Sequence, residues 1–136
     1  MENRSKLREK CMTILYQIEI YNKNNIEYDV DEVIKNVSLV DNEFVKEIVY
    51  GVLTYKNDID KLANKYMNDW TIDRLGNTDI AIMRMGIFEL LYTSVPSVVA
   101  INEAVELAKK YSDEKVRKMI NGVLDKILHE EKKDEW

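Results

Sequence analysis

The chain has 136 residues, of which 46% are hydrophobic and 33% charged, and its formal net charge is -5. This size and composition are typical of one globular domain, expected over residues 1–130, and no apolar run approaches the roughly 20 residues that cross a bilayer. The amino terminus is charged and shows no secretory signal, and the single cysteine excludes an internal disulfide framework. We therefore expect a soluble cytoplasmic protein.

Charge is distributed unevenly along the chain. Residues 1–10 hold four basic residues against two acidic ones, whereas residues 27–47 hold seven acidic residues against two lysines. The net acidity argues against an indiscriminate nucleic-acid binder, because such binding needs clustered Lys and Arg. We expect the basic end to meet an anion, and the acidic segment to face water or a basic partner.

The hydrophobic periodicity along the chain is that of helices. The chain has only four glycines and one proline, and strand-like alternation is hard to find. The pattern predicts an all-α fold of about seven helices in two packed halves, near residues 4–22, 30–37, 42–55, 57–69, 78–93, 98–111 and 113–129. Residues 71–75 are expected to form a single turn between the halves, and residues 131–136 a frayed end.

The first predicted helix combines an apolar stripe with basic residues. The stripe contains Leu7, Cys11, Ile14, Leu15 and Ile18. Arg4 and Arg8 lie together on its flank and Tyr16 lies beyond them, so replacing either arginine should leave thermal unfolding unchanged. Arginines beside an exposed ring suit single-stranded nucleic acid, which needs phosphate contacts and base stacking. The alternative is that Tyr16 borders the core and the arginines pair with nearby acids.

The segment 78–93 is apolar almost all round, which predicts a central, buried helix. Arg84 and Glu89 interrupt it, and a buried charge must be paired or lead to solvent. An internal ion pair is at least as well supported here as a ligand contact. Gly51 and Gly86 are expected to allow close approach between helices.

The segment 98–111 has an apolar side and a polar side. Asn102 and Glu103 fall on the polar side, and Glu106 is placed to pair with Lys110 one turn later. Physical reasoning alone therefore predicts that the Asn-Glu pair faces water.

In the last predicted helix, Gly122 falls opposite the core stripe, where glycine costs about 1 kcal/mol relative to alanine. Asn121 is its neighbour, and three lysines surround it on the same side: Lys115, Lys118 and Lys126. A glycine without a side chain, surrounded by lysines, would let a phosphate-bearing strand or another backbone come close. The alternative is a glycine tolerated on a solvated lysine face.

Residues for catalysis are scarce. His129 is the only histidine, and the sequence has no Cys-His cluster and no Gly-rich phosphate loop. We therefore expect a binding protein without a metal or other cofactor.

Five segments together resemble the NusB family of bacterial transcription antitermination factors. They are "RSKLREKCMTILYQ", "VYGVLTYKNDID", "DWTIDRLGNTDIAIMRMGIFELL", "VPSVVAINEAVELAKKY" and "MINGVLDKI". The resemblance covers Arg4 to about Leu128 and implies a seven-helix protein that binds boxA, a short single-stranded RNA element. It further implies the ribosomal protein NusE as partner, within an antitermination complex on RNA polymerase that usually serves ribosomal RNA operons.

The resemblance also implies where RNA would bind. The matching positions are Arg4, Lys6, Arg8, Tyr16, Arg84, Lys118 and Met119. Many members have a denser run of arginines at the start and an aromatic residue where this chain has Met119. A basic ribosomal protein would suit the acidic segment.

Two other functions are compatible with the sequence. A similar domain precedes certain ribosomal RNA cytosine methyltransferases, so the chain could assist a separate catalytic chain. A protein-only scaffold would instead use the basic helix to bind an acidic partner. Some family members pair with themselves, and the sequence leaves a homodimer open.

Overall fold

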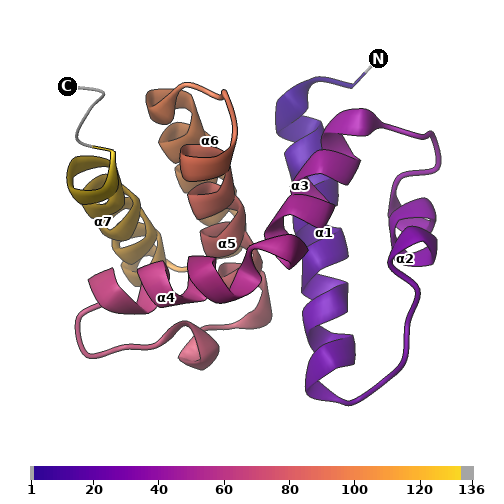
Figure 1. Cartoon of the computed structure of the whole chain (residues 1–136), viewed down its shortest axis with the longest axis horizontal. Coiled ribbons are helices and arrows are strands. Elements are labelled where there is room, and N and C mark those ends of the chain that lie inside the picture. Colours follow the sequence, from indigo (N-terminus) through magenta and orange to yellow (C-terminus); the bar gives the residue numbers. More distant parts are fainter. Residues whose placement is uncertain (1, 133–136) are drawn as a thin grey trace.

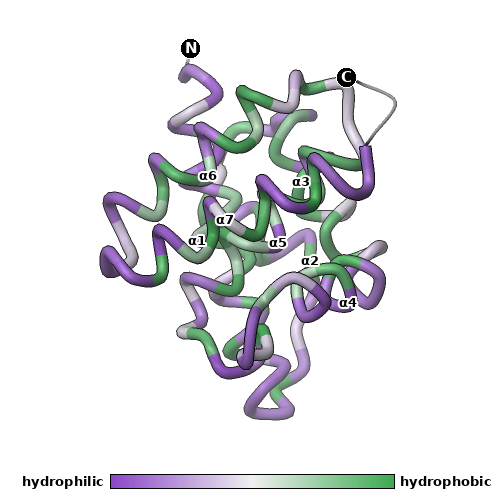
Figure 2. The backbone as a smooth tube through the Cα atoms, turned by 90° about the vertical axis from the view of Figure 1, so that its left-hand side faces the viewer, coloured by the Kyte–Doolittle hydropathy of each residue, from purple (hydrophilic) through white to green (hydrophobic). Residues whose placement is uncertain are grey.

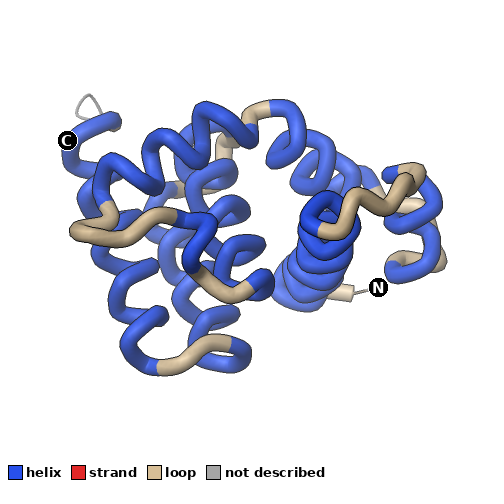
Figure 3. Tube along the Cα trace, turned by 90° about the horizontal axis from the view of Figure 1, so that it is seen from below, coloured by secondary structure: helices blue, strands red, loops and turns tan. Residues whose placement is uncertain are grey.

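The computed structural model describes residues 2–132. These form seven α-helices and one 3-10 turn: α1 (Arg4–Lys23), α2 (Val30–Val37), α3 (Glu43–Thr54), α4 (Lys56–Tyr66), η1 (Ile72–Arg74), α5 (Asn77–Tyr92), α6 (Ser97–Tyr111) and α7 (Glu114–Glu131). Figure 3 shows these helices joined by loops, with no strand in the described part of the chain. The all-α prediction is confirmed. None of the described helices is long and apolar enough to cross a membrane.

Short polar side chains begin four of the helices. In each case an Asn or Asp oxygen accepts a hydrogen bond from a backbone N–H three residues later, which satisfies one of the free donors at a helix start. The capping residues are Asn3, Asp29, Asn42 and Asp113, at 2.8 to 3.2 Å. The starts expected near Asn42 and Asp113 are therefore confirmed.

Two helix ends differ from the prediction by more than one residue. Helix α4 ends at Tyr66, before the expected 69, and Asp69 then takes a left-handed φ of 60°, which Asp tolerates better than most residues. Helix α7 continues to Glu131, whose carboxylate accepts a hydrogen bond from the Tyr66 hydroxyl and lies 3.3 Å from the Lys65 ammonium. The expected fraying is therefore wrong at Glu131, and residues 133–136 lie outside the described part.

The helices form two halves that meet at α5. Figure 1 shows α1 to α3 on one side and α4, α6 and α7 on the other, and α5 contacts α1, α3, α4, α6 and α7. Most side chains of α5 are buried on every face, as predicted. Elsewhere hydrophobic and hydrophilic stretches alternate along the helices, as amphipathic segments require (Figure 2).

Two glycines allow helices to approach closely, as expected. A Cβ on Gly86 would lie 2.9 Å from Leu124 Cδ1 and 3.2 Å from Ala104 Cβ, so α5 packs tightly against α6 and α7. A Cβ on Gly51 would lie 2.1 Å from Phe88 Cζ. The contact at Gly86 thus fixes the position of α7 relative to α5, and the contact at Gly51 fixes that of α3.

Candidate nucleic-acid interface

The start of α1 presents exposed basic side chains. Arg4 and Lys6 are exposed, and the Cζ of Arg4 lies 4.7 Å from the centroid of the Phe44 ring. Tyr16, three turns further along α1, is 39% exposed. These three side chains are accessible to a ligand, and their contact with RNA stays a prediction.

Arg8 does not belong to this exposed surface. Its Nε and Nη2 each lie 2.7 Å from a carboxylate oxygen of Glu89 in α5, and its Nη1 lies 3.3 Å from Glu103 in α6. Arg8 is 3% exposed and Glu89 is 2% exposed. The expectation that Arg8 flanks the core without joining it is therefore wrong, because two acids from distant segments draw its guanidinium inward. The alternative, pairing with acids, holds for this residue.

Burial and pairing act on Arg8 in opposite directions. Burial disfavours the charged guanidinium, but the hydrogen bonds and charge of Glu89 and the charge of Glu103 outweigh it and raise the pKa of Arg8. The side chain is therefore a permanent buried cation that joins α1 to α5 and α6.

Glu103 contributes to the same contact between helices. Its carboxylate accepts a hydrogen bond of 2.9 Å from the Ser5 hydroxyl and pairs with Arg8. Asn102 beside it is exposed. The prediction that the Asn-Glu pair faces water thus holds for Asn102 and is wrong for Glu103, because the start of α1 lies beside Glu103.

The other charges of α6 also differ from the expected pairing. Glu106 lies 3.3 Å from Lys109, whereas Lys110 lies 3.3 Å from Glu9 in α1. The predicted Glu106–Lys110 pair is therefore absent, because the acid on α1 takes the lysine. Contacts between α1 and α6 continue along this side.

Arg84 in α5 lies in a second network of ion pairs. Its Nη1 is 2.7 Å from Glu19 in α1, and its Nε and Nη2 are 2.9 and 3.0 Å from the two carboxylate oxygens of Asp60 in α4. Of the two possibilities left open for the charges of the central helix, the internal ion pair is the one present: Glu89 is held by Arg8, and Arg84 by two other acids. A ligand that bound Arg84 would compete with both carboxylates.

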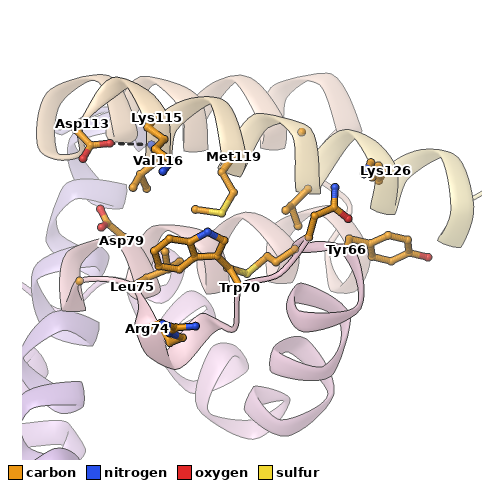
Figure 4. A pocket seen from close by; sticks show the side chains of 15 residues that line it. Tyr66, Trp70, Arg74, Leu75, Asp79, Asp113, Lys115, Val116, Met119 and Lys126 are labelled. Atoms are coloured by element: carbon orange, nitrogen blue, oxygen red, sulfur yellow. Dashed lines mark hydrogen bonds between the residues drawn. The ribbon is translucent and has the colours of Figure 1, made fainter.

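A groove separates α7 from residues 66–76. It encloses about 510 Å³ and is shown in Figure 4, with Val116 and Met119 on the α7 side and Trp70 facing them. Among the described residues its cations are Arg74, Lys115 and Lys126. The groove is thus lined by apolar side chains together with three basic and two acidic residues.

The groove brings together part of the predicted site on α7. Lys115, Met119 and Gly122 line it, and a Cβ on Gly122 would meet nothing within 4 Å. Lys118 and Asn121 are exposed on α7 outside the groove, and the Lys118 ammonium lies 3.2 Å from Glu114. Gly122 therefore leaves open space on a face with lysines, which fits both a ligand site and a glycine tolerated on a solvated face.

Trp70 and Arg74 were missed by sequence reasoning. The indole of Trp70 is 38% exposed, and its ring centroid lies 5.3 Å from Arg74 Cζ and 5.8 Å from Lys115 Nζ. Arg74 falls in the predicted turn 71–75, and Trp70 lies between that turn and the predicted helix 57–69, so no periodicity applies to either. The segment "DWTIDRLG" was used for the family resemblance, but neither residue was assigned a role.

The predicted residues thus lie on two separate surfaces. Figure 1 places α7 and α1 on opposite sides of α5, so the groove and the exposed start of α1 do not form one patch. The acidic segment 27–47 covers α2 and the beginning of α3, away from α7. An elongated ligand would be needed to reach both basic surfaces.

A family model described as the NusB family matches residues 5–129. The chain belongs to the NusB family. Its relatives named transcription antitermination protein NusB include one from Campylobacter jejuni subsp. jejuni, 37% identical over 97% of this chain and 100% of the relative. Another, from an Exiguobacterium strain, is 42% identical over 94% of this chain and 98% of the relative.

Solved NusB structures share the fold. NusB from T. maritima has a TM-score of 0.81 and 28% identity, and covers 99% of each chain. A chain from a crystal structure of antitermination factors NusB and NusE in complex with dsRNA has a TM-score of 0.78 and 28% identity, over 93% of this chain and 96% of that one. The two helical halves are therefore those of the NusB fold.

Proposed function

We propose that this NusB-family chain is a transcription antitermination factor that binds boxA-type RNA together with NusE and joins the antitermination complex on RNA polymerase. The observation that carries the proposal is the similarity, over nearly the full length, to proteins named for transcription antitermination. Support for a direct role in RNA binding comes from the exposed cations at the start of α1 and along the groove.

Exposed lysines and arginines suit RNA because they neutralise phosphates and release counterions. Arg4 and Lys6 would contact one part of the strand, and Lys115 would contact another part beside α7. Since the two surfaces lie apart, one RNA that engages both would gain affinity through effective concentration. The buried Arg8 would act indirectly, by fixing α1 against α5 and α6.

The test is fluorescence anisotropy of a labelled boxA-like RNA, with the protein alone and with its cognate NusE. A scrambled single strand and a boxA duplex serve as RNA controls. We expect NusE to tighten sequence-dependent binding, and the logarithm of the affinity to fall with the logarithm of salt concentration by about 0.7 per neutralised phosphate of a single strand. Absence of binding at low salt, with and without NusE, would refute the proposal and favour a protein-only scaffold.

Matched lysine variants locate the contact. Lys115→Ala should reduce affinity and lower the salt slope, whereas Lys35→Ala removes an exposed lysine of α2, far from the groove, and should change neither. Arg4→Ala tests the other surface and should leave unfolding unchanged, because Arg4 is exposed. If all three variants bind RNA as tightly as the parent chain, neither basic surface is the binding site.

A further inference from the structure

The groove beside α7 contains an exposed tryptophan with no evident structural need for its exposure. Trp70 follows the end of α4 and keeps 38% of its surface accessible. Indole is a large apolar surface, so its exposure costs free energy unless a ligand covers it. Figure 4 shows the ring directed into the groove opposite Met119 rather than into the core.

The cations around the ring define the chemistry of a ligand. Arg74 and Lys115 lie within 6 Å of the indole centroid, at 5.3 and 5.8 Å, and Lys126 also lines the groove. An aromatic face bordered by cations matches a nucleotide, which offers a flat base for stacking and a phosphate for ion pairing. Lys115 is exposed, so it can move from the ring to a phosphate at little cost.

The two acids of the groove each have a structural partner. Asp113 accepts a hydrogen bond of 2.8 Å from the Val116 backbone N–H, and Asp79 accepts one from the Ser112 hydroxyl. Both carboxylates thus hold the start of α7, and each keeps its negative charge. Three cations and two anions therefore line the groove among the described residues, and the two cations nearest the indole are Arg74 and Lys115.

The groove also has room for a base. Its volume of about 510 Å³ falls within the range of small-molecule sites. Gly122 has no side chain to fill it, and Met119 is a flexible apolar side chain that can adapt to a flat ligand.

We propose that Trp70 is the stacking platform for one unpaired base of the bound RNA, and that Lys115 and Arg74 hold the adjoining phosphate. This inference rests on the proposed function and deepens it. It assigns base stacking in the groove to the segment between α4 and α5. The lining residues of α7 include no aromatic ring, because Met119 stands where many family members have one.

The experiment compares Trp70→Leu, which keeps an apolar side chain, and Trp70→Phe, which keeps a smaller ring. Tyr50→Leu is the matched control, because Tyr50 is also 38% exposed but lies on α3. The probe is boxA-like RNA with cognate NusE. We expect Trp70→Leu to weaken binding roughly 5- to 150-fold, the range for loss of one stacked base. Trp70→Phe should restore part of the loss, and Tyr50→Leu should bind normally.

Two further readouts separate stacking from charge. The salt slope should be unchanged in Trp70→Leu but smaller by about 0.7 in Lys115→Ala. A series of RNAs, each with one abasic site at a different position, locates the stacked base. At a single position the missing base should weaken binding to the parent chain but leave the binding of Trp70→Leu unchanged. Equal losses for both proteins at every position would overturn the stacking assignment.

A fluorescence measurement covers the case in which Trp70→Leu fails to fold. The chain has two tryptophans, so Trp136→Phe leaves Trp70 as the only one, and RNA should then quench its emission. Unchanged emission on saturation with RNA would overturn the inference while leaving the proposed function intact. If the parent chain binds no RNA, both fail. If Trp70→Leu loses NusE in the absence of RNA but binds RNA normally, the groove takes protein and the inference is wrong.

Discussion

Replacing Arg8 by methionine should destabilise the protein strongly, although Arg8 stands in the basic start of α1. The substitution leaves the Glu89 carboxylate, only 2% exposed, without the two hydrogen bonds of 2.7 Å that it now accepts. Removing one partner of a buried ion pair costs about 3–5 kcal/mol, because the remaining charge is buried without compensation. That is a large share of the roughly 5–15 kcal/mol that stabilises a typical domain.

The assay is urea unfolding followed by circular dichroism at 222 nm and, in parallel, by tryptophan fluorescence. In a thermal melt of the same variant, the unfolding midpoint should fall by about 10–15 °C, because a chain of this size loses about 3 °C per kcal/mol of stability. Arg4→Met is the matched control, because it removes an exposed arginine one turn earlier. It should change stability by less than about 0.5 kcal/mol.

A double variant tests the reason for the effect. Arg8→Met with Glu89→Leu removes both charges and should recover most of the lost stability, because no unpaired carboxylate is left in the core. Glu103 keeps its hydrogen bond from Ser5 and is partly exposed, so it can remain ionised. Equal urea midpoints for Arg8→Met and Arg4→Met would refute the argument from the buried pair.

Three other predictions use glycines and the cysteine. Gly86→Ala should destabilise the protein by about 1–3 kcal/mol through overpacking against Leu124. Gly122→Ala should stabilise it by about 0.5–1 kcal/mol, because the added Cβ meets open space. Urea unfolding of both variants measures the two effects, and a more stable Gly86→Ala than Gly122→Ala would contradict the packing. Gly122→Leu should weaken RNA binding in the anisotropy assay without loss of helicity, and a collapse of the 222 nm signal would show instead a packing role. Burial raises the pKa of the Cys11 thiol to about 12, so thiol reagents at pH 8 should label it only after unfolding; rapid labelling of the native protein would refute this.

The helices could be predicted from the sequence because their signals are local. Asn42 and Asp113 each cap the helix that begins at the next residue, and the apolar run of α5 is visible without knowledge of any partner. The ends were less predictable. Glu131 stays helical with the help of Tyr66, a residue 65 positions earlier in the chain.

The site was harder to predict because it depends on distant pairs. Arg8 and Glu89 are separated by 81 residues, and a helical wheel cannot tell a flank that meets another helix from one that meets water. Glu103 was assigned to the solvent side for the same reason. Gly122 was recognised because its anomaly is intrinsic to its own helix, whereas Trp70 lies in a segment where no period applies.

The position of α5 has a consequence for how the molecule comes apart. This helix supplies buried side chains to the contacts with α1 and α3 and equally to those with α4, α6 and α7. Neither half retains a complete interior when α5 is withdrawn. Arg8 would lose Glu89 in the same event, and Arg84, which belongs to α5, would lose both Glu19 and Asp60. We therefore expect one shared opening to expose the backbone amides of both halves to exchange, so that the two halves unfold as a single cooperative unit.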